Sequence, residues 1–390
     1  MKTYTGRLID GQTVAVEVDG ATIRQVRPVP DDASLPWLLP VLVDLQHNGA
    51  LGTAYGTVGT APKGELRRIG EFLLRQGVGR CLLTLATYPV AVLQESCKAI
   101  RAALEADPVL DRLYCGVFHE GLFISPEAGW RGAHNLNWIL PPDYSLIATF
   151  DELLGGRIAM VNIAPELTGS DDFIAATIQA GKRVSLGHCN PTPDQIEAAV
   201  ELGASLVTHL GNGAAPEIHR FRNPFWRFLT DDRLAAGVIL DGHHLPADFV
   251  RTVFRCKDRK HIFPISDASG YSGYHPGSYR DSAERDLVIE TNGFLHLKGS
   301  EILCGAWHQL PRAVEFLVQE LNLSFPSAWR QCSLVPAEIA GLELPTVEVG
   351  QEASFVVASW DGHLHIEESV HGGVSYQPIH RYCQKFYEKI

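Results

Sequence analysis

Residues 183–212 read RVSLGHCNPTPDQIEAAVELGASLVTHLGN, with two strand-like segments on either side of a helical one. The apolar runs at 183–188 and 205–210 are typical of buried parallel strands, and residues 192–202 have the apolar spacing of an amphipathic helix. The stretch therefore predicts a strand–helix–strand unit. Each of its two strands ends in a histidine, His188 and His209.

The same alternation extends through the middle of the chain in both directions. Strand-like apolar runs occur at 41–46, 80–86, 114–120, 157–163, 183–188, 205–210, 236–241 and 261–267. Helical spacing occurs between most of them, at 63–76, 90–106, 144–154, 171–180, 192–202 and 247–254. Strands that alternate with helices form a parallel sheet, and eight such strands can close into a barrel. The predicted fold class is therefore α/β, a (β/α)8 TIM barrel.

The two ends of the chain have a different pattern, made of short strands joined by tight turns. We expect residues 1–40 and 346–390 to come together as one small β-sandwich domain, around a hydrolase barrel at residues 41–345. After the eighth strand, residues 287–297 read as an inserted hairpin that turns at Asn292-Gly293.

Composition and charge exclude several classes of protein. The 390 residues carry 33 Lys and Arg against 45 Asp and Glu, a net charge of −12, and contain no concentrated basic run. This balance argues against nucleic acid or an anionic membrane as a partner. The eight cysteines form no C-x-x-C pair, which argues against a zinc ribbon or a redox motif. No apolar stretch approaches the roughly 18 residues of a membrane span, and the first residues do not resemble a signal peptide. We expect a soluble cytoplasmic protein.

Polar side chains follow the predicted strands at the end where TIM barrels place their active sites. They are Gln46, Asn48, Glu120, His188, His209, Asp241, His244 and Asp267. One carboxylate and two imidazoles can hold a divalent metal and leave a position for water, so Glu120, His188 and His209 are candidate ligands. Asp267 could serve as a catalytic carboxylate or as a helix N-cap.

Short motifs that run along nearly the whole chain resemble the amidohydrolase superfamily and, within it, the N-acetylglucosamine-6-phosphate deacetylase family. They are VDLQHNG at 43–49, HEG at 119–121, FISP at 123–126, GAH at 132–134, APE at 164–166, GHCN at 187–190, THLGN at 208–212, DGHH at 241–244 and SDA at 266–268.

The resemblance implies a role for each matching residue. Glu120, His188 and His209 would ligate the metal, and Asp267 would be the catalytic carboxylate. His134 would contact the substrate near the acyl carbonyl. The remaining substrate-binding residues would be Asn212, Gly213, Arg222 and His244, with His244 reaching the substrate from the seventh strand or across a dimer interface.

The resemblance also implies one metal per chain. Many superfamily members begin with H-x-H and bind two metals, whereas this chain has Gln46 and Asn48 at those positions and no lysine in residues 157–163. Zn²⁺ is the expected ion, although other first-row ions also suit two histidines and a glutamate.

The chain departs from the family in the loop after the sixth strand, which reads HLGNGA at 209–214 and RFRNPF at 220–225. Arg222 is the better match to the family's phosphate-binding arginine, with Arg220 as the alternative. The implied reaction is the hydrolysis of N-acetylglucosamine 6-phosphate to glucosamine 6-phosphate and acetate, by a homodimer acting on a small molecule. Three alternatives stay open: another N-acylated or non-phosphorylated amine as substrate, a cyclic-amide hydrolase, and a non-catalytic oligomeric scaffold.

Overall fold

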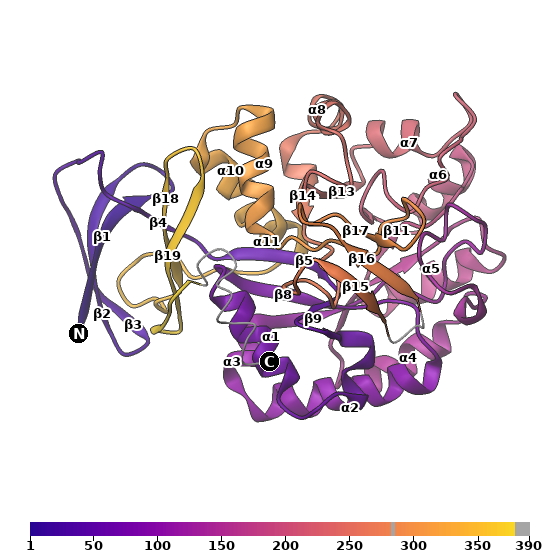
Figure 1. Cartoon of the computed structure of the whole chain (residues 1–390), viewed down its shortest axis with the longest axis horizontal. Helices are drawn as coiled ribbons and strands as arrows, with labels where there is room; N and C mark the ends of the chain where they lie inside the picture. Colours follow the sequence, from indigo (N-terminus) through magenta and orange to yellow (C-terminus); the bar gives the residue numbers. More distant parts are fainter. Residues whose placement is uncertain (282–284, 379–390) are drawn as a thin grey trace.

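The computed structural model describes residues 1–281 and 285–378, and its centre is an eight-stranded parallel sheet (Figure 1). In spatial and chain order, the strands are β5 (Leu42–His47), β8 (Val78–Leu85), β9 (Tyr114–His119), β10 (Ile158–Ile163), β11 (Arg183–Leu186), β12 (Leu206–Val207), β13 (Ala235–Ile239) and β14 (Ile262–Ile265). All eight were predicted from their apolar runs, and the (β/α)8 barrel is confirmed.

The barrel closes where the chain beyond β14 meets β5. The backbone N–H of Asp267 donates to the carbonyl of Gln46 at 2.9 Å, and the N–H of Asn48 donates to the carbonyl of Ala268 at 2.8 Å. The closing contacts therefore lie at the carboxyl ends of the strands and run through three of the polar residues expected there.

Helices surround the strands as the spacing predicts. They are α1 (Glu65–Leu74), α2 (Val90–Ala106), α3 (Pro108–Leu113), α4 (Tyr144–Leu153), α5 (Ser170–Gln179), α6 (Pro193–Glu201), α7 (Phe225–Thr230) and α8 (Ala247–Cys256). Helix α6 begins with a capping box, in which the side chain of Thr192 accepts from the Gln195 N–H and the Gln195 side chain accepts from the Thr192 N–H. The six-residue helices α3 and α7 were not predicted, because one or two turns give too little periodicity to detect.

Three further helices follow the barrel strands and connect them to the terminal sheet: α9 (Pro311–Leu321), α10 (Phe325–Gln331) and α11 (Leu334–Ala340). The indole N–H of Trp329, which is fully buried in α10, donates to the carbonyl of Pro40 at 2.7 Å. This bond ties the helices to the segment that enters β5.

The two ends of the chain meet in one seven-stranded sheet beside the barrel (Figure 1). Its order is β20 (Val374–Tyr376), β19 (Leu364–His371), β18 (Phe355–Trp360), β4 (Trp37–Leu39), β1 (Lys2–Leu8), β2 (Thr13–Asp19) and β3 (Thr22–Pro28). The sheet has its own core, in which the ring of Tyr4 packs edge-on against that of Phe355, with the ring centroids 4.9 Å apart. The proposed boundaries at 40 and 345 stay predictions, and residues 379–390 of the last segment lie outside the described residues.

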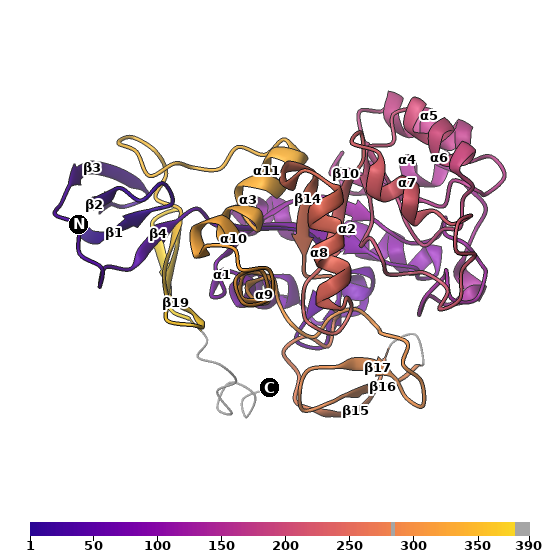
Figure 2. The same cartoon turned by 90° about the horizontal axis from the view of Figure 1, so that it is seen from above.

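The insertion after β14 is larger than the predicted hairpin. It is a three-stranded antiparallel sheet of β15 (Gly277–Arg280), β16 (Asp286–Ile289) and β17 (Leu295–Leu297), which projects from the barrel in Figure 2. Strand β15 escaped prediction because its four residues, GSYR, lack alternating apolar positions.

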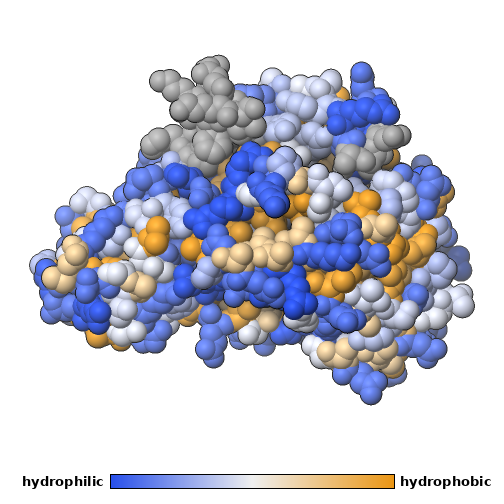
Figure 3. All heavy atoms as spheres, turned by 90° about the horizontal axis from the view of Figure 1, so that it is seen from below, coloured by the Kyte–Doolittle hydropathy of each residue, from blue (hydrophilic) through white to orange (hydrophobic). Residues whose placement is uncertain are grey.

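No helix in the ranges 1–281 and 285–378 combines the length and apolar character needed to cross a membrane. On the face drawn in Figure 3, apolar residues reach the surface in patches bordered by hydrophilic ones.

Candidate active site

A cavity of about 820 Å³ opens at the carboxyl ends of the barrel strands. Its walls come from the loops after β8, β9 and β12 and from the segment that follows β14. Nine of the sequence-predicted site residues line it: Asn48, Glu120, His134, His188, His209, Asn212, Gly213, His244 and Asp267. This volume falls within the range of roughly 300–1,000 Å³ that is typical of small-molecule sites.

Three of these residues have an unusual backbone. His188, His209 and Asp267 have positive φ angles of 51°, 29° and 49°. L-residues rarely adopt this left-handed conformation, and its cost of about 1–3 kcal/mol is tolerated chiefly where the surrounding structure imposes it, often at functional sites. The strain coincides with the ends of β11, β12 and β14, where the chain turns away and leaves these side chains facing the cavity.

Glu120, His188 and His209 bring their polar atoms to one point. The Nε2 atom of His209 lies 3.0 Å from Oε1 of Glu120 and 3.0 Å from Nε2 of His188. The Nε2 atom of His188 lies 3.5 Å from the same Oε1 of Glu120. In a tetrahedral zinc site with bonds of about 2.0–2.1 Å, ligand atoms lie roughly 3.3 Å apart. The three side chains therefore fit a single small divalent cation.

The tautomer of His188 suits this role. Its Nδ1 lies 2.9 Å from the carbonyl oxygen of Trp130, so Nδ1 carries a proton, and in the neutral ring Nε2 presents a lone pair. The loop after β12 passes close to this ring at Gly213, which has a φ of 58°. A Cβ at this position would lie 2.5 Å from Nδ1 of His188, so any larger residue would clash with the imidazole. The Nδ1 of His209 is buried without a partner among the described residues.

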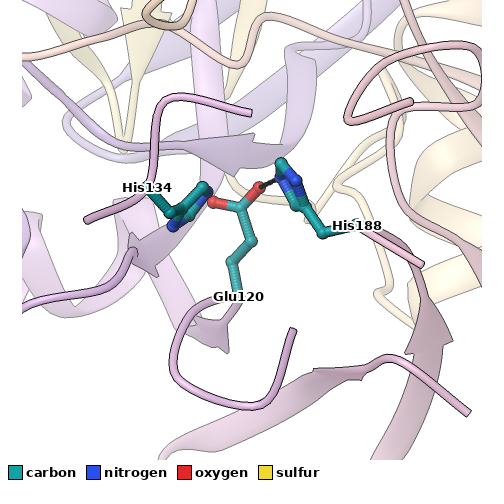
Figure 4. A group of neighbouring side chains, drawn as sticks. All are labelled: Glu120, His134 and His188. Atoms are coloured by element: carbon teal, nitrogen blue, oxygen red, sulfur yellow. Dashed lines mark ion pairs between the residues drawn. The ribbon is translucent and has the colours of Figure 1, made fainter. Parts of the chain in front are cut away.

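His134 approaches the same point from the other side of Glu120 (Figure 4). One ligand-capable atom each of Glu120, His134 and His188 lie within 4.8 Å of one another, so these three form a second possible ligand set. We favour the set with His209, since its atoms lie within 3.5 Å of each other.

The orientation of His134 is fixed by Thr87. The hydroxyl of Thr87 accepts from the N–H of Leu122 at 3.2 Å and lies 2.7 Å from Nδ1 of His134. Burial, followed by the charge of His188, lowers the pKa of His134 to about 3, so its ring is neutral. With the hydroxyl proton directed to Nδ1, the remaining N–H of the ring is at Nε2, a tautomer that follows from this network.

Gln46 and Asn48 act as hydrogen-bond donors rather than as ligands. The amide nitrogen of Gln46 donates to Oε1 of Glu120 at 2.8 Å and to Oδ1 of Asp267 at 3.1 Å. The amide nitrogen of Asn48 donates to the same Oδ1 of Asp267 at 2.7 Å. Both NH₂ groups thus point toward carboxylates, an orientation that repels a second cation.

The two buried carboxylates have opposite pKa shifts. Burial raises the pKa of Glu120, but its hydrogen bonds with His188 and His209 outweigh burial and hold the pKa well below its usual range. Burial and then the charge of Glu120 raise the pKa of Asp267 to about 7. These two groups are thus poised in different protonation states near neutral pH, a pattern typical of active sites. A bound cation would act in the opposite direction on Asp267.

His244 is held by Asp241 at the end of β13. The carboxylate of Asp241 lies 2.8 Å from Nδ1 of His244 and accepts from the backbone N–H groups of His243 and His244. Burial lowers the pKa of His244, but Asp241 outweighs it and the pKa is raised. Burial raises the pKa of Asp241, but the charge of His244 and the hydrogen bonds outweigh it and the pKa is lowered. The contact with Asp241 therefore favours the charged form of His244, which lines the cavity.

The predicted residues of the loop after β12 separate into two groups. Asn212 and Gly213 line the cavity, and the amide of Asn212 donates to the carbonyl of His209 at 3.3 Å. Arg222 is exposed and is not among the residues that line the cavity. The structure therefore does not bring Arg222 into the site of its own chain.

Sequence reasoning missed the residues that orient the site. Thr87 directs His134, and Trp130 directs His188 through its backbone carbonyl. A backbone carbonyl has no sequence signal. Thr87, two residues after β8, could have been found only by treating every hydroxyl near a strand end as a candidate.

The sequence and the fold have counterparts among known proteins. No protein-family model matches the chain. The chain is 28% identical to the N-acetylglucosamine-6-phosphate deacetylase of Rattus norvegicus, over 94% of this chain and 89% of that protein. It is 28% identical to the N-acetylgalactosamine-6-phosphate deacetylase of Escherichia coli O157:H7, over 93% and 92% of the two chains.

A solved N-acetylglucosamine-6-phosphate deacetylase of Mycobacterium smegmatis, crystallised with N-acetylglucosamine 6-phosphate, has the same fold. The two structures superpose with a TM-score of 0.81 and 24% sequence identity, over 94% of this chain and 95% of that one. The resemblance inferred from the motifs is therefore confirmed by independent comparisons of sequence and of structure.

The first prediction concerns metal content. We expect the purified protein to hold about one divalent metal per chain, because Gln46 and Asn48 turn donors toward the position of a second ion. His188→Ala and His209→Ala should each lose the metal, as measured by elemental analysis. His243→Ala removes a half-buried histidine that does not line the cavity and should leave the metal content unchanged. Two metals per chain would contradict this prediction.

The second prediction concerns the Asp241–His244 ion pair. His244, with a raised pKa, contributes stability below its ordinary pKa of 6.5 that is lost as pH rises through the folded value. Asp241, with a lowered pKa, contributes stability above 3.8 that is lost as pH falls through its folded value. Asp241→Asn should therefore lower the melting temperature more at about pH 5.5 than at about pH 9.

A matched control for this measurement is Asp361→Asn, which breaks the exposed pair between Asp361 and His365. Solvent screening makes such a pair weak, so no measurable change is expected at either pH. Equal destabilisation by Asp241→Asn at both pH values would show that His244 is not charged in the folded protein.

Proposed function

We propose that this chain, which resembles the deacetylase of Rattus norvegicus over 94% of its length, is a metal-dependent deacetylase of an amino-sugar phosphate. The proposed reaction converts N-acetylglucosamine 6-phosphate and water into glucosamine 6-phosphate and acetate. The observation that carries the proposal is the convergence of Glu120, His188 and His209 within 3.5 Å beside Asp267 in one cavity. A scaffold protein would have no need of this buried, strained cluster.

Glu120, His188 and His209 would hold one divalent metal, and Zn²⁺ suits one carboxylate and two imidazoles. When bound, such an ion supplies Lewis acidity, which polarises an amide carbonyl and makes water more acidic. The buried position of the three side chains, at 3%, 6% and 2% exposure, excludes bulk water and strengthens these electrostatic effects.

Asp267 is the proposed general base and acid. Its Oδ1 receives both amide donors, from Gln46 and Asn48, and its Oδ2 accepts no hydrogen bond from the described residues. Oδ2 is therefore the oxygen that can take a proton from the attacking water. The same proton then passes to the nitrogen of the leaving amine, which departs as the C–N bond breaks.

His134 is the proposed donor to the carbonyl oxygen. Its Nδ1 is engaged with Thr87, so the Nε2–H is free to face the acyl group beside Glu120 and His188. A preorganised donor stabilises the negative charge that develops on this oxygen when water adds to the carbonyl.

The opposite end of the substrate is proposed to meet Asn212, Gly213, His244 and Arg222.

A second candidate function is deacetylation of a non-phosphorylated or differently acylated amine, and one observation favours it. Among the described residues that line the cavity, there is no lysine and a single arginine, Arg285. Its guanidinium lies 2.6 Å from Oδ2 of Asp281 and is therefore already paired with a carboxylate. The homodimer and the cytoplasmic location stay predictions.

The third prediction tests the role of Asp267. No helix of the described chain begins directly after Asp267, so the side chain is not the helix N-cap that the sequence allowed. Asp267→Asn keeps the shape of the side chain but cannot shuttle a proton. We expect kcat to fall by roughly 10²–10⁴-fold, the usual contribution of a positioned acid–base group. Acetate release from N-acetylglucosamine 6-phosphate measures this change, and elemental analysis should show that the metal remains.

The control for this variant is Asp44→Asn, which changes a buried aspartate of β5 that accepts from the N–H of Ser266 but does not line the cavity. Its effect on kcat should be much smaller. Activity of Asp267→Asn within about tenfold of wild type, with metal bound, would overturn the proposed proton transfer.

The fourth prediction separates the two candidate substrates. A charge-assisted hydrogen bond to phosphate contributes about 1.5–3 kcal/mol, so Arg222→Ala should raise KM about tenfold or more for the phosphorylated sugar only. Arg220→Ala is the comparison, since Arg220 lies over the ring of Phe221 and is the alternative match to the phosphate-binding arginine. A selective rise in KM in that variant instead would assign the phosphate contact to Arg220. Equal KM values of wild type and Arg222→Ala would favour the non-phosphorylated substrate.

A further inference from the structure

Two aromatic side chains line the cavity but have no part in the proposed chemistry. Tyr88 and Trp138 stack on each other with ring centroids 5.8 Å apart and planes inclined by 24°. Tyr88 follows β8, and Trp138 ends the short 3-10 helix η2 (Leu136–Trp138) in the loop after β9. The pair thus joins two walls of the cavity.

The position of the pair is fixed on both sides. Tyr88 directly follows Thr87, and Trp138 comes four residues after His134. The stacked rings and the Thr87–His134 hydrogen bond therefore join the same two loops. Gly56 packs against the ring of Tyr88, where a Cβ would lie 2.5 Å from Cδ2. The aromatic faces are therefore preorganised, which lowers the entropy cost of binding against them.

The depth of the pair identifies which part of a substrate it meets. The reacting centre is buried, with Glu120 at 3% and His209 at 2% exposure. Tyr88 and Trp138 are only half-buried, and the neighbouring Leu136 is 50% exposed. The acyl group must reach the buried centre, so the remainder of the molecule extends outward toward the aromatic pair.

The charges of the cavity favour stacking over ionic recognition for this part of the substrate. Four acidic side chains line the described part of the cavity: Glu120, Asp267, Asp281 and Glu301. The basic side chains there are paired, Arg285 with Asp281 and His244 with Asp241. A pyranose ring is uncharged and has a face of C–H groups. The negative face of an aromatic ring attracts such C–H groups, and the contact also removes apolar surface from water.

We infer that Tyr88 and Trp138 form a specificity platform on which the pyranose ring of the acetylated amino sugar stacks while its acetyl group enters the metal-ligand cluster. This inference rests on the proposed function for the identity of the sugar. It assigns to Trp138 a contribution to substrate affinity rather than to the chemical step.

Steady-state kinetics with N-acetylglucosamine 6-phosphate provides the first test. Trp138→Ala should raise KM about tenfold with kcat within about twofold of wild type, because the stacking contact is equal in ground and transition states. Trp138→Phe keeps a flat face and should stay within about threefold. Leu136→Ala, a change on the same 3-10 helix outside the cavity, should leave both constants unchanged.

Binding of the two reaction products makes the test independent of activity. Calorimetry on the metal-loaded protein should show that Trp138→Ala weakens glucosamine 6-phosphate about tenfold and leaves acetate affinity unchanged. Trp138→Leu keeps apolar volume without a flat face, and it should reproduce the weaker sugar binding if Trp138→Ala fails to fold.

Three results would overturn the platform. They are unchanged sugar affinity in both Trp138→Ala and Trp138→Leu, a fall in kcat at constant KM, or an equal loss of acetate and sugar affinity. The last two would show that Trp138 only holds the loop of His134 in place. Absence of acetate release by the wild-type protein would instead refute the proposed function, while Trp138-dependent sugar binding would still support the platform.

Discussion

Two carboxylates, Glu120 and Asp267, are buried side by side at the mouth of the barrel, and the rest of the site is arranged around their mutual repulsion. Gln46 donates to both, and Asn48 donates a second bond to Asp267. Backbone bonds at the same place close the barrel between β5 and the segment after β14. The closure of the fold and the pairing of the two carboxylates therefore depend on each other. A change at Gln46 would disturb the barrel seam and the site together.

Most of the barrel could be predicted from the sequence because its strands are buried on both faces and read as continuous apolar runs. The eight barrel strands, β5 and β8 to β14, and the long helices around them follow from this pattern. What escaped depends on contacts rather than periodicity. Helix α3 begins because the side chain of Asp107 accepts from the N–H of Val109, and strand β15 exists only because it pairs with β16. Neither signal is strong enough in a segment of four to six residues.

The candidate ligands could be predicted by position, since strand ends meet at one rim of a barrel. Their precise orientation could not. The positive φ angles of His188, His209 and Asp267 are imposed by tertiary structure, and the carbonyl that orients His188 belongs to Trp130, 58 residues earlier. The stack of Tyr88 and Trp138 likewise joins positions that no local pattern connects. The role of Arg222 stays a prediction, because it rests on a motif match alone and the side chain lies exposed outside the cavity of its own chain.

The amides of Gln46 and Asn48 also explain how metal binding and proton transfer are coupled. Without a cation, the charge of Glu120 adds to burial and raises the pKa of Asp267, so that near neutral pH the carboxyl is partly protonated and a poor base. A cation held by Glu120, His188 and His209 would neutralise this repulsion, while the two amide donors favour the ionised carboxylate. Histidines in place of these amides would offer ligand atoms to a second cation instead. The proposed single-metal chemistry would therefore use the donors at positions 46 and 48, because they leave Asp267 unligated and favour its ionised form.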